Sequence, residues 1–168
     1  QGTYPLPEAQ LDRFLIKINV LHPTAEVEKQ ILRNHAQGFN AARLEHSGLT
    51  QIATAEDLLA MRRTLTSVRV DEGIIEYIAD IVGRSRAHRS VYLGASPRAS
   101  IGLLSVARAL AASEGREFVI PDDVKALAPA VLRHRLILHP DAEIEGVSAD
   151  DCVDDILREA KVPKTAAS

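Results

Sequence analysis

Two arginines carry the most specific chemistry in this sequence. Arg13 lies in Leu-Asp-Arg-Phe at residues 11–14, and Arg98 lies in Gly-Ala-Ser-Pro-Arg-Ala at residues 94–99. We expect the first where a short helix ends and the second where a long helix begins, so the backbone would hold each of them in place. Phosphoryl transfer needs such an arginine, because charge on the transferred oxygens must be neutralised by a positioned donor. The pair therefore indicates a protein that handles a nucleotide.

The residues that usually cradle the phosphates do not accompany these arginines. The sequence contains no Gly-x-x-x-x-Gly-Lys-Ser/Thr and no apolar strand followed by paired acids that could hold magnesium. We therefore expect one part of a nucleotide-hydrolysing machine, without its phosphate-binding half.

Composition bounds the class of protein. With 168 residues, 46% of them apolar, the chain can form one ordinary domain with a core of its own. A net charge of −3 gives no field that would favour specific nucleic acid or an anionic membrane as the main partner. One cysteine forms no internal disulfide, and no apolar run reaches the roughly 20 residues of a membrane span, so we expect a cytoplasmic protein without membrane insertion. An N-terminal Gln1 in place of methionine indicates a segment of a longer chain.

The periodicity of apolar residues predicts a mainly α-helical fold. A short helix should follow Pro7 and run to Asp12. Cap residues and apolar stripes then predict helices over residues 24–37, 54–65, 71–82, 96–114, 121–133 and 148–160. Pro129 should break or kink the fifth of these helices before His134.

Residues 14–20 have the pattern of a strand that is apolar on both faces, yet the rest of the chain offers no good partner strand. The backbone N–H and C=O groups of an uncovered strand need hydrogen-bond partners, and its apolar faces need to be buried. We therefore expect residues 2–22 to pair with a second copy or to pack irregularly against the helices. Either arrangement would displace Arg13 from a finger-like position.

Four separated blocks carry a family resemblance. Residues 2–14, Gly-Thr-Tyr-Pro-Leu-Pro-Glu-Ala-Gln-Leu-Asp-Arg-Phe, closely resemble the end of the ATPase core in the MoxR family of AAA+ proteins. The blocks at residues 92–99, 115–125 and 131–136 follow in the family's order. The magnesium chelatase and replicative helicase group shares the Asp-Arg-Phe motif. The motif Gly-Arg-Glu-Phe-Val-Ile-Pro-Asp-Asp at residues 115–123 resembles the MoxR family more closely.

This resemblance implies a fold and a division of the chain. The fold is the helical bundle lid domain of an AAA+ ATPase, with one N-terminal strand left over from an α/β core. Residues 1–23 would be the remnant of that core, residues 24–163 the lid, and residues 164–168 a disordered tail. The Walker A lysine, the Walker B acids and the sensor 1 asparagine would precede Gln1, so the segment alone should not hydrolyse ATP.

The resemblance also implies roles for individual residues. Arg13 corresponds to the arginine finger, which enters the nucleotide pocket of the neighbouring subunit in trans. Arg98 corresponds to the sensor 2 arginine at the ATP γ-phosphate, presented by Ser96 and Pro97. ATP and Mg²⁺ would be the cofactors of the full-length protein, with none bound tightly to this segment and no resident metal site. The full-length protein would form a hexameric ring that remodels or activates a partner, either a protein with a von Willebrand factor A domain or a metalloenzyme.

Other interpretations of the same residues remain open. Arg98 can pair with a carboxylate instead of a phosphate, and both pairings can hold in different nucleotide states. A basic cluster follows one of the predicted helices, at Arg84, Arg86, His88 and Arg89. We interpret it as cations that stabilise the C-terminus of that helix, and not as a nucleic-acid patch, because no aromatic residues are interleaved with them.

Residues 133–135 are expected to be cap and interface residues, and Cys152 a buried small side chain. The alternative for the whole chain is a helical protein-interaction or DNA-associated module that shares the lid fold and has no catalytic role.

Overall fold

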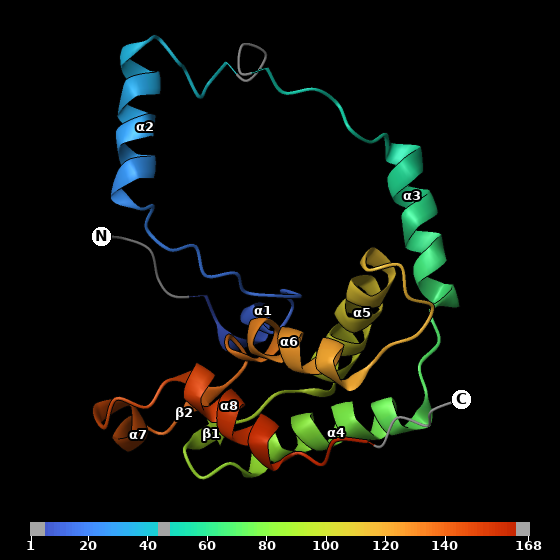
Figure 1. The fold of residues 1–168 in the computed structure, drawn as a ribbon. Coiled ribbons are helices and arrows are strands. Elements are labelled where there is room, and N and C mark those ends of the chain that lie inside the picture. Colours follow the sequence, from blue (N-terminus) through green and yellow to red (C-terminus); the bar gives the residue numbers. More distant parts are fainter. Residues whose placement is uncertain (1–5, 44–47, 164–168) are drawn as a thin grey trace. The chain divides into compact units, whose positions relative to one another are not determined.

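A computed structural model describes residues 6–43 and 48–163 of the chain (Figure 1). The chain divides into two compact units, one made of residues 1–18 and 63–168 and the other of residues 19–62. Both units are helical in the described residues, which confirms the predicted mainly α class.

The helices and strands follow one another along the chain in an order that the sequence largely predicts. They are α1 (Glu8–Leu11), α2 (Ala25–Ala36), α3 (Ala55–Thr64), the 3₁₀ turn η2 (Leu65–Ser67), α4 (Glu72–Ala87), β1 (Val91–Leu93), α5 (Pro97–Ser113), α6 (Pro121–Leu132), β2 (Ile137–Leu138), α7 (Pro140–Ile144) and α8 (Ala149–Glu159).

Hydroxyl side chains begin the predicted helices. The oxygens of Thr24, Ser96 and Ser148 accept hydrogen bonds from backbone N–H groups in the first turns of α2, α5 and α8. At α8 the Asp151 carboxylate also accepts from the Ser148 backbone N–H and hydroxyl, which lowers the pKa of Asp151. The predicted starts of these helices are confirmed because caps are encoded within a few residues.

Helices α4, α5, α6 and α8 enclose the core of the larger unit, and Figure 1 shows α4 and α8 running side by side. Ala99, Ala107 and Ala111 are fully buried along α5. Their small side chains allow α4 and α6 to approach this helix closely, as the alanine-rich sequence predicts. The stripe of α8 is buried as well, at Cys152, Val153 and Ile156.

The prediction of a strand over residues 14–20 is wrong, because the structure has no strand there. Residues 16–20 have no regular secondary structure, and Lys17 attaches to α6, with its N–H donating to the Ala130 carbonyl at 2.8 Å. A strand needs a neighbouring strand for its hydrogen bonds, and among the described residues none lies beside it. Irregular packing, one of the two arrangements expected, is observed for residues 14–17, whereas pairing with a second copy stays a prediction.

Several short features were not predicted. β1 and β2 form an antiparallel pair in which Val91 lies opposite Leu138, and α7 begins at Pro140. Helix α6 ends at Leu132 with Arg133 as its C-cap, before His134 as predicted, although it continues for three residues beyond Pro129. Motif residues 2–5 and the tail at 164–168 lie outside the described residues.

Candidate functional site at the start of helix α5

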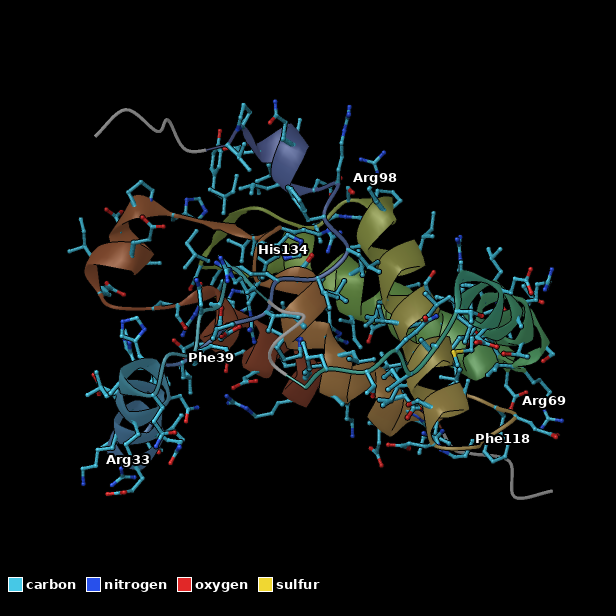
Figure 2. The ribbon with its side chains drawn as sticks, turned by 90° about the horizontal axis from the view of Figure 1, so that it is seen from above. Arg33, Phe39, Arg69, Arg98, Phe118 and His134 are labelled. Atoms are coloured by element: carbon cyan, nitrogen blue, oxygen red, sulfur yellow. The ribbon has the colours of Figure 1, made fainter. Side chains whose placement is uncertain are left out.

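Arg98 occupies the second position of α5, as the sequence predicts. Ser96 is the N-cap of the helix and Pro97 its first residue, and the Arg98 N–H donates to the Ser96 hydroxyl at 3.2 Å. The Arg98 side chain is 56% exposed (Figure 2), and its Nη1 lies 3.7 Å from the Asp12 Oδ2. A cation at a helix N-terminus is electrostatically unfavourable, so this site calls for an anion.

Asp12 joins this helix start to the N-terminal segment. The Ser96 hydroxyl donates to the Asp12 carboxylate, at 3.1 Å to Oδ1 and 2.9 Å to Oδ2. The Arg135 Nε donates to Asp12 Oδ1 at 3.1 Å. One carboxylate therefore links the two arginine motifs, which are 84 residues apart at Asp12 and Ser96.

Arg13 directly follows this carboxylate and is exposed. Its backbone N–H donates to the Gln10 carbonyl at 3.2 Å, so its backbone continues the turn that ends α1. Within the part of the chain that the structure describes, the Arg13 side chain has no ion-pair partner. Irregular packing of the segment thus leaves this guanidinium exposed and available to an anion outside this set of residues, and the displacement of Arg13 from a finger-like position stays a prediction.

Arg135 lies just after α6 and is the most enclosed cation of the site, with 2% of its side chain exposed. Its Nη2 donates to the carbonyls of Asp12 at 3.1 Å and Phe14 at 2.5 Å. Its Nη1 donates to the carbonyls of Leu15, at 3.1 Å, and Val131. Burial lowers the pKa of Arg135, and the Asp12 carboxylate acts in the opposite direction.

His134 adds a second contact to the same segment. Its Nε2 lies 2.9 Å from the Phe14 carbonyl, which makes this nitrogen the donor (Figure 2 labels the residue). The Nδ1 atom is buried and has no hydrogen-bond partner among the described residues. Burial lowers the pKa of His134, and the nearby Arg135 and Lys17 charges act in the same direction. The imidazole is therefore held neutral near pH 7.

A cavity of about 580 Å³ opens beside these residues. Charged and polar side chains from the N-terminal segment, the N-cap of α5 and the end of α6 line it, among them Glu8, Asp12, Lys17, Ser96, Arg133, His134 and Arg135.

The loop before α5 is fixed to the end of α4. The Ala95 N–H donates to the buried Ser85 hydroxyl at 3.0 Å, and the Arg86 Nε donates to the Ala95 carbonyl at 2.8 Å. At Gly94 an added Cβ would lie 2.6 Å from the Arg86 Cα and from the Ser85 carbonyl oxygen. The glycine of the Gly-Ala-Ser-Pro-Arg-Ala motif thus permits a backbone contact that positions the start of α5.

The block at residues 115–123 has a structural role. Arg116 donates to both carboxylate oxygens of Asp123, at 2.8 and 2.6 Å, and Asp123 is buried. The same carboxylate accepts the Ile120 N–H at 2.9 Å, which caps α6. The hydrogen bonds between Arg116 and the Asp123 carboxylate raise the pKa of Arg116 most, and the bond to Glu114 acts in the same direction. Arg69 lies over the neighbouring Phe118 ring at 5.8 Å (Figure 2), which extends this contact region to the segment before α4.

Residues of the basic cluster pair within the molecule. Arg84 binds Asp80 at 2.9 Å and lies 3.4 Å from Glu159, while the His88 Nε2 is 3.7 Å from Asp155. Arg84 and Arg86 lie in the last turn of α4, where cations favour the helix dipole.

Cys152 is buried as expected, and burial raises the pKa of its thiol.

Sequence reasoning did not identify Asp12 and Arg135 as members of the site. A signal for Arg135 was present, because it lies between Leu132 and Leu136 on the buried side of the chain. A cation among apolar neighbours predicts a buried partner. The partner itself is 123 positions away, and no local pattern connects the two residues.

Comparison with protein families supports the same architecture. Residues 83–156 match the family model described as the AAA lid domain. No helix among the described residues is both long and apolar enough to cross a bilayer.

Several curated proteins resemble nearly the whole chain. The uncharacterized protein YeaC of Bacillus subtilis is 44% identical over 97% of this chain and 49% of its own length. The chaperone MoxR1 of Mycobacterium tuberculosis is 36% identical over 99% of this chain and 45% of its own length. The chain thus spans about half the length of the curated relatives it matches.

A solved structure extends the likeness to three dimensions. The crystal structure of a predicted ATPase from Cytophaga hutchinsonii superposes with a TM-score of 0.86 at 34% identity, over 98% of this chain and 51% of that one. The lid match, the MoxR relatives and the shared fold agree with one another. The chain therefore belongs to the MoxR family of AAA+ ATPases and contains the C-terminal lid region of that family.

Proposed function

We propose that this chain is the lid and arginine-finger segment of an ATPase that couples ATP binding and hydrolysis in an oligomeric ring to the remodelling or activation of a partner protein. Arg13 acts in trans as the finger, and Arg98 acts as sensor 2 on the ATP γ-phosphate, with Ser96 and Pro97 fixing its backbone. The observation that carries the proposal is the Asp12 carboxylate, which joins the Arg13 segment to the helix start that presents Arg98.

The surroundings of Arg98 fit a phosphate. Its guanidinium is exposed, and its one ion-pair contact among the described residues is Asp12 at 3.7 Å, too long for a hydrogen bond. A γ-phosphate would provide the closer, charge-assisted bonds that the helix start favours. In this proposal the Asp12 carboxylate is the partner of Arg98 when ATP is absent.

The activity belongs to the full-length protein, with ATP and Mg²⁺ as its cofactors. Within it, residues 1–23 form the end of the ATPase core, residues 24–163 the lid and residues 164–168 a tail. The segment alone is expected to hydrolyse no ATP, because catalysis depends on a phosphate cradle and magnesium that its residues do not supply. The assembly proposed is a hexameric cytoplasmic ring, and its client is a protein with a von Willebrand factor A domain or a metalloenzyme.

Two substitutions in the full-length protein test the proposal. Arg13→Ala should lower kcat by about a thousandfold and leave ATP affinity unchanged, since a finger acts mainly in the transition state. Arg98→Ala should weaken binding of a non-hydrolysable ATP analogue more than binding of ADP, because only ATP carries the γ-phosphate. Steady-state ATPase assays and equilibrium titrations measure these effects.

Arg158→Ala is the matched control, because Arg158 is exposed and its one ion-pair partner among the described residues is Asp155 in the same helix. It should retain wild-type turnover and affinity. Equal losses of ATP and ADP affinity in Arg98→Ala would instead support a structural pairing with Asp12. A normal kcat in Arg13→Ala would refute the finger assignment.

A further inference from the structure

We infer that Arg135 is a positioning residue for Arg13: it fixes the backbone on both sides of Arg13 against the C-terminal end of α6. The inference rests on the proposed function only in giving Arg13 a catalytic role. The attachment of the segment to α6 is a separate, structural statement.

The contacts of Arg135 flank Arg13 on either side. Its Nη2 donates to the carbonyl before Arg13, that of Asp12, and to the carbonyl after it, that of Phe14. Its Nε binds the Asp12 side chain at 3.1 Å, and its Nη1 reaches the Leu15 carbonyl at 3.1 Å. These bonds leave the Arg13 side chain itself free to project.

Arg135 is itself well fixed. Its Nη1 also donates to the Val131 carbonyl in α6, so every N–H group of the guanidinium has an acceptor. A buried charge requires this full set of partners, because each missing one would leave a desolvated donor. A planar guanidinium can reach several carbonyls at fixed angles, which the point charge of lysine cannot do.

Neighbouring residues strengthen the attachment. The His134 Nε2 shares the Phe14 carbonyl at 2.9 Å, and the Lys17 N–H binds the Ala130 carbonyl of α6. The side chain of Leu15 lies over Gly102 in α5, where an added Cβ would be 3.3 Å from its Cδ1. The segment that carries Arg13 is therefore held by both α5 and α6.

The consequence for the proposed ATPase is a connection between the lid and the finger. Any displacement of the end of α6 would be transmitted through Arg135 to the backbone of residues 12–15. Catalytic groups lose about a hundredfold in rate when misplaced by roughly 1 Å, so loosening this attachment should lower turnover without touching nucleotide.

Hydrogen–deuterium exchange in the full-length protein tests the attachment directly. In Arg135→Met, exchange of the amides of residues 13–17 should become faster by about tenfold or more, since several hydrogen bonds to a charged group are lost. Peptides from α4 and α8 should exchange as in the wild type. Arg135→Lys retains a charge for Asp12 but not the carbonyl contacts, so it should fold and show the same local effect.

Arg133→Met is the matched control. Arg133 lies two positions earlier and is also partly buried, but it binds Asp150 at 2.9 Å and makes no hydrogen bond or ion pair with residues 12–15. This variant removes a charged contact from the same end of α6. It should leave exchange of residues 13–17 unchanged.

A double-mutant cycle tests the connection to Arg13. Arg135→Met should lower kcat by about a hundredfold with an unchanged KM. Combined with Arg13→Ala, it should cause no further loss beyond that of Arg13→Ala alone, because a positioning residue acts only through the group it positions. A purely structural role would lower the melting temperature and give multiplicative losses of kcat.

Each outcome is decisive. Unchanged exchange of residues 13–17 in both Arg135 variants would overturn the attachment, whatever Arg13 does. Faster exchange with multiplicative losses of kcat would overturn the positioning of Arg13. If Arg13→Ala alone has normal turnover, the proposed function fails, while the exchange measurement still decides whether Arg135 fixes the segment.

Discussion

The arginines of this chain differ in how completely their donors are occupied. Arg116 and Arg135 are both largely enclosed and bind carboxylates and carbonyls with most of their N–H groups. Arg13 and Arg98 are both exposed. Of these two arginines, only Arg98 has an ion-pair contact among the described residues, with Asp12 at 3.7 Å. A guanidinium whose N–H groups all have acceptors within the protein stabilises the fold, whereas an exposed guanidinium with free N–H donors can bind a ligand. This contrast separates the structural arginines from the candidate functional ones.

Arg116→Met should destabilise the protein by about 3 kcal/mol, because it leaves the buried Asp123 carboxylate without its charged partner. Urea unfolding followed by circular dichroism measures the change. Arg158→Met is the control, since an exposed pair within one helix contributes less than about 0.5 kcal/mol. Similar stabilities for the two variants would contradict a structural role for the ion pair of Arg116.

At the scale of elements, the start of α5 depends on the end of α4. The Ser85 hydroxyl and the Arg86 guanidinium hold Ala95 from both sides, one residue before the N-cap Ser96. Arg98 is therefore presented by a helix start that is anchored to the core. The close approach that allows this anchoring occurs at Gly94.

Gly94→Ala should destabilise the protein by about 3 kcal/mol, because its Cβ would lie 2.6 Å from backbone atoms that cannot move aside easily. Gly83→Ala is the control, since Gly83 lies inside α4 with nothing within 4 Å of the added Cβ. That substitution should stabilise the helix by about 0.5–1 kcal/mol. Thermal unfolding measures the stability of both variants. A Gly94→Ala variant as stable as Gly83→Ala would contradict the close contact.

How far the sequence predicts each element depends on how local its determinants are. The starts of α5 and α8 follow from Ser96-Pro97 and from Ser148 with Asp151, which act within one turn. The apolar alternation over residues 14–20 indicates two apolar faces but not a partner strand, so the strand prediction fails. The pairing of β1 with β2 joins Val91 to Leu138, and no nearby residues specify it.

The candidate site shows the same limit. Arg98 could be placed from its own cap and proline, whereas the contact of Asp12 with Arg135 depends on how α6 folds back onto the N-terminal segment.

At the scale of the whole molecule, His134 predicts a dependence of stability on pH. Burial holds its pKa below the ordinary value near 6.5, so the unfolded chain binds more protons than the folded one as pH falls below about 6.5. Its contribution to stability is complete above that pH and decreases on acidification. Urea unfolding at pH 7.5 and 5.5 should show a smaller difference in His134→Gln than in the wild type. Identical pH dependence of the two proteins would contradict a neutral His134 in the folded state.

The proposed ring requires that Arg13 act on the nucleotide of a neighbour. One full-length variant, Arg13→Ala, can bind ATP but supplies no finger. A second variant with its phosphate-binding lysine replaced supplies Arg13 but binds no ATP. Each is expected to be inactive alone, because a complete catalytic site needs both parts.

Mixing these two inactive variants is the most direct test of a finger acting in trans. ATPase activity should return when mixed rings form, because Arg13 of one subunit then completes the ATP-loaded pocket of the other. Native mass spectrometry would verify that the rings contain both variants. Mixed rings that remain as inactive as the separate variants would contradict the role of Arg13 in trans, and with it the proposal that this chain supplies the arginine finger.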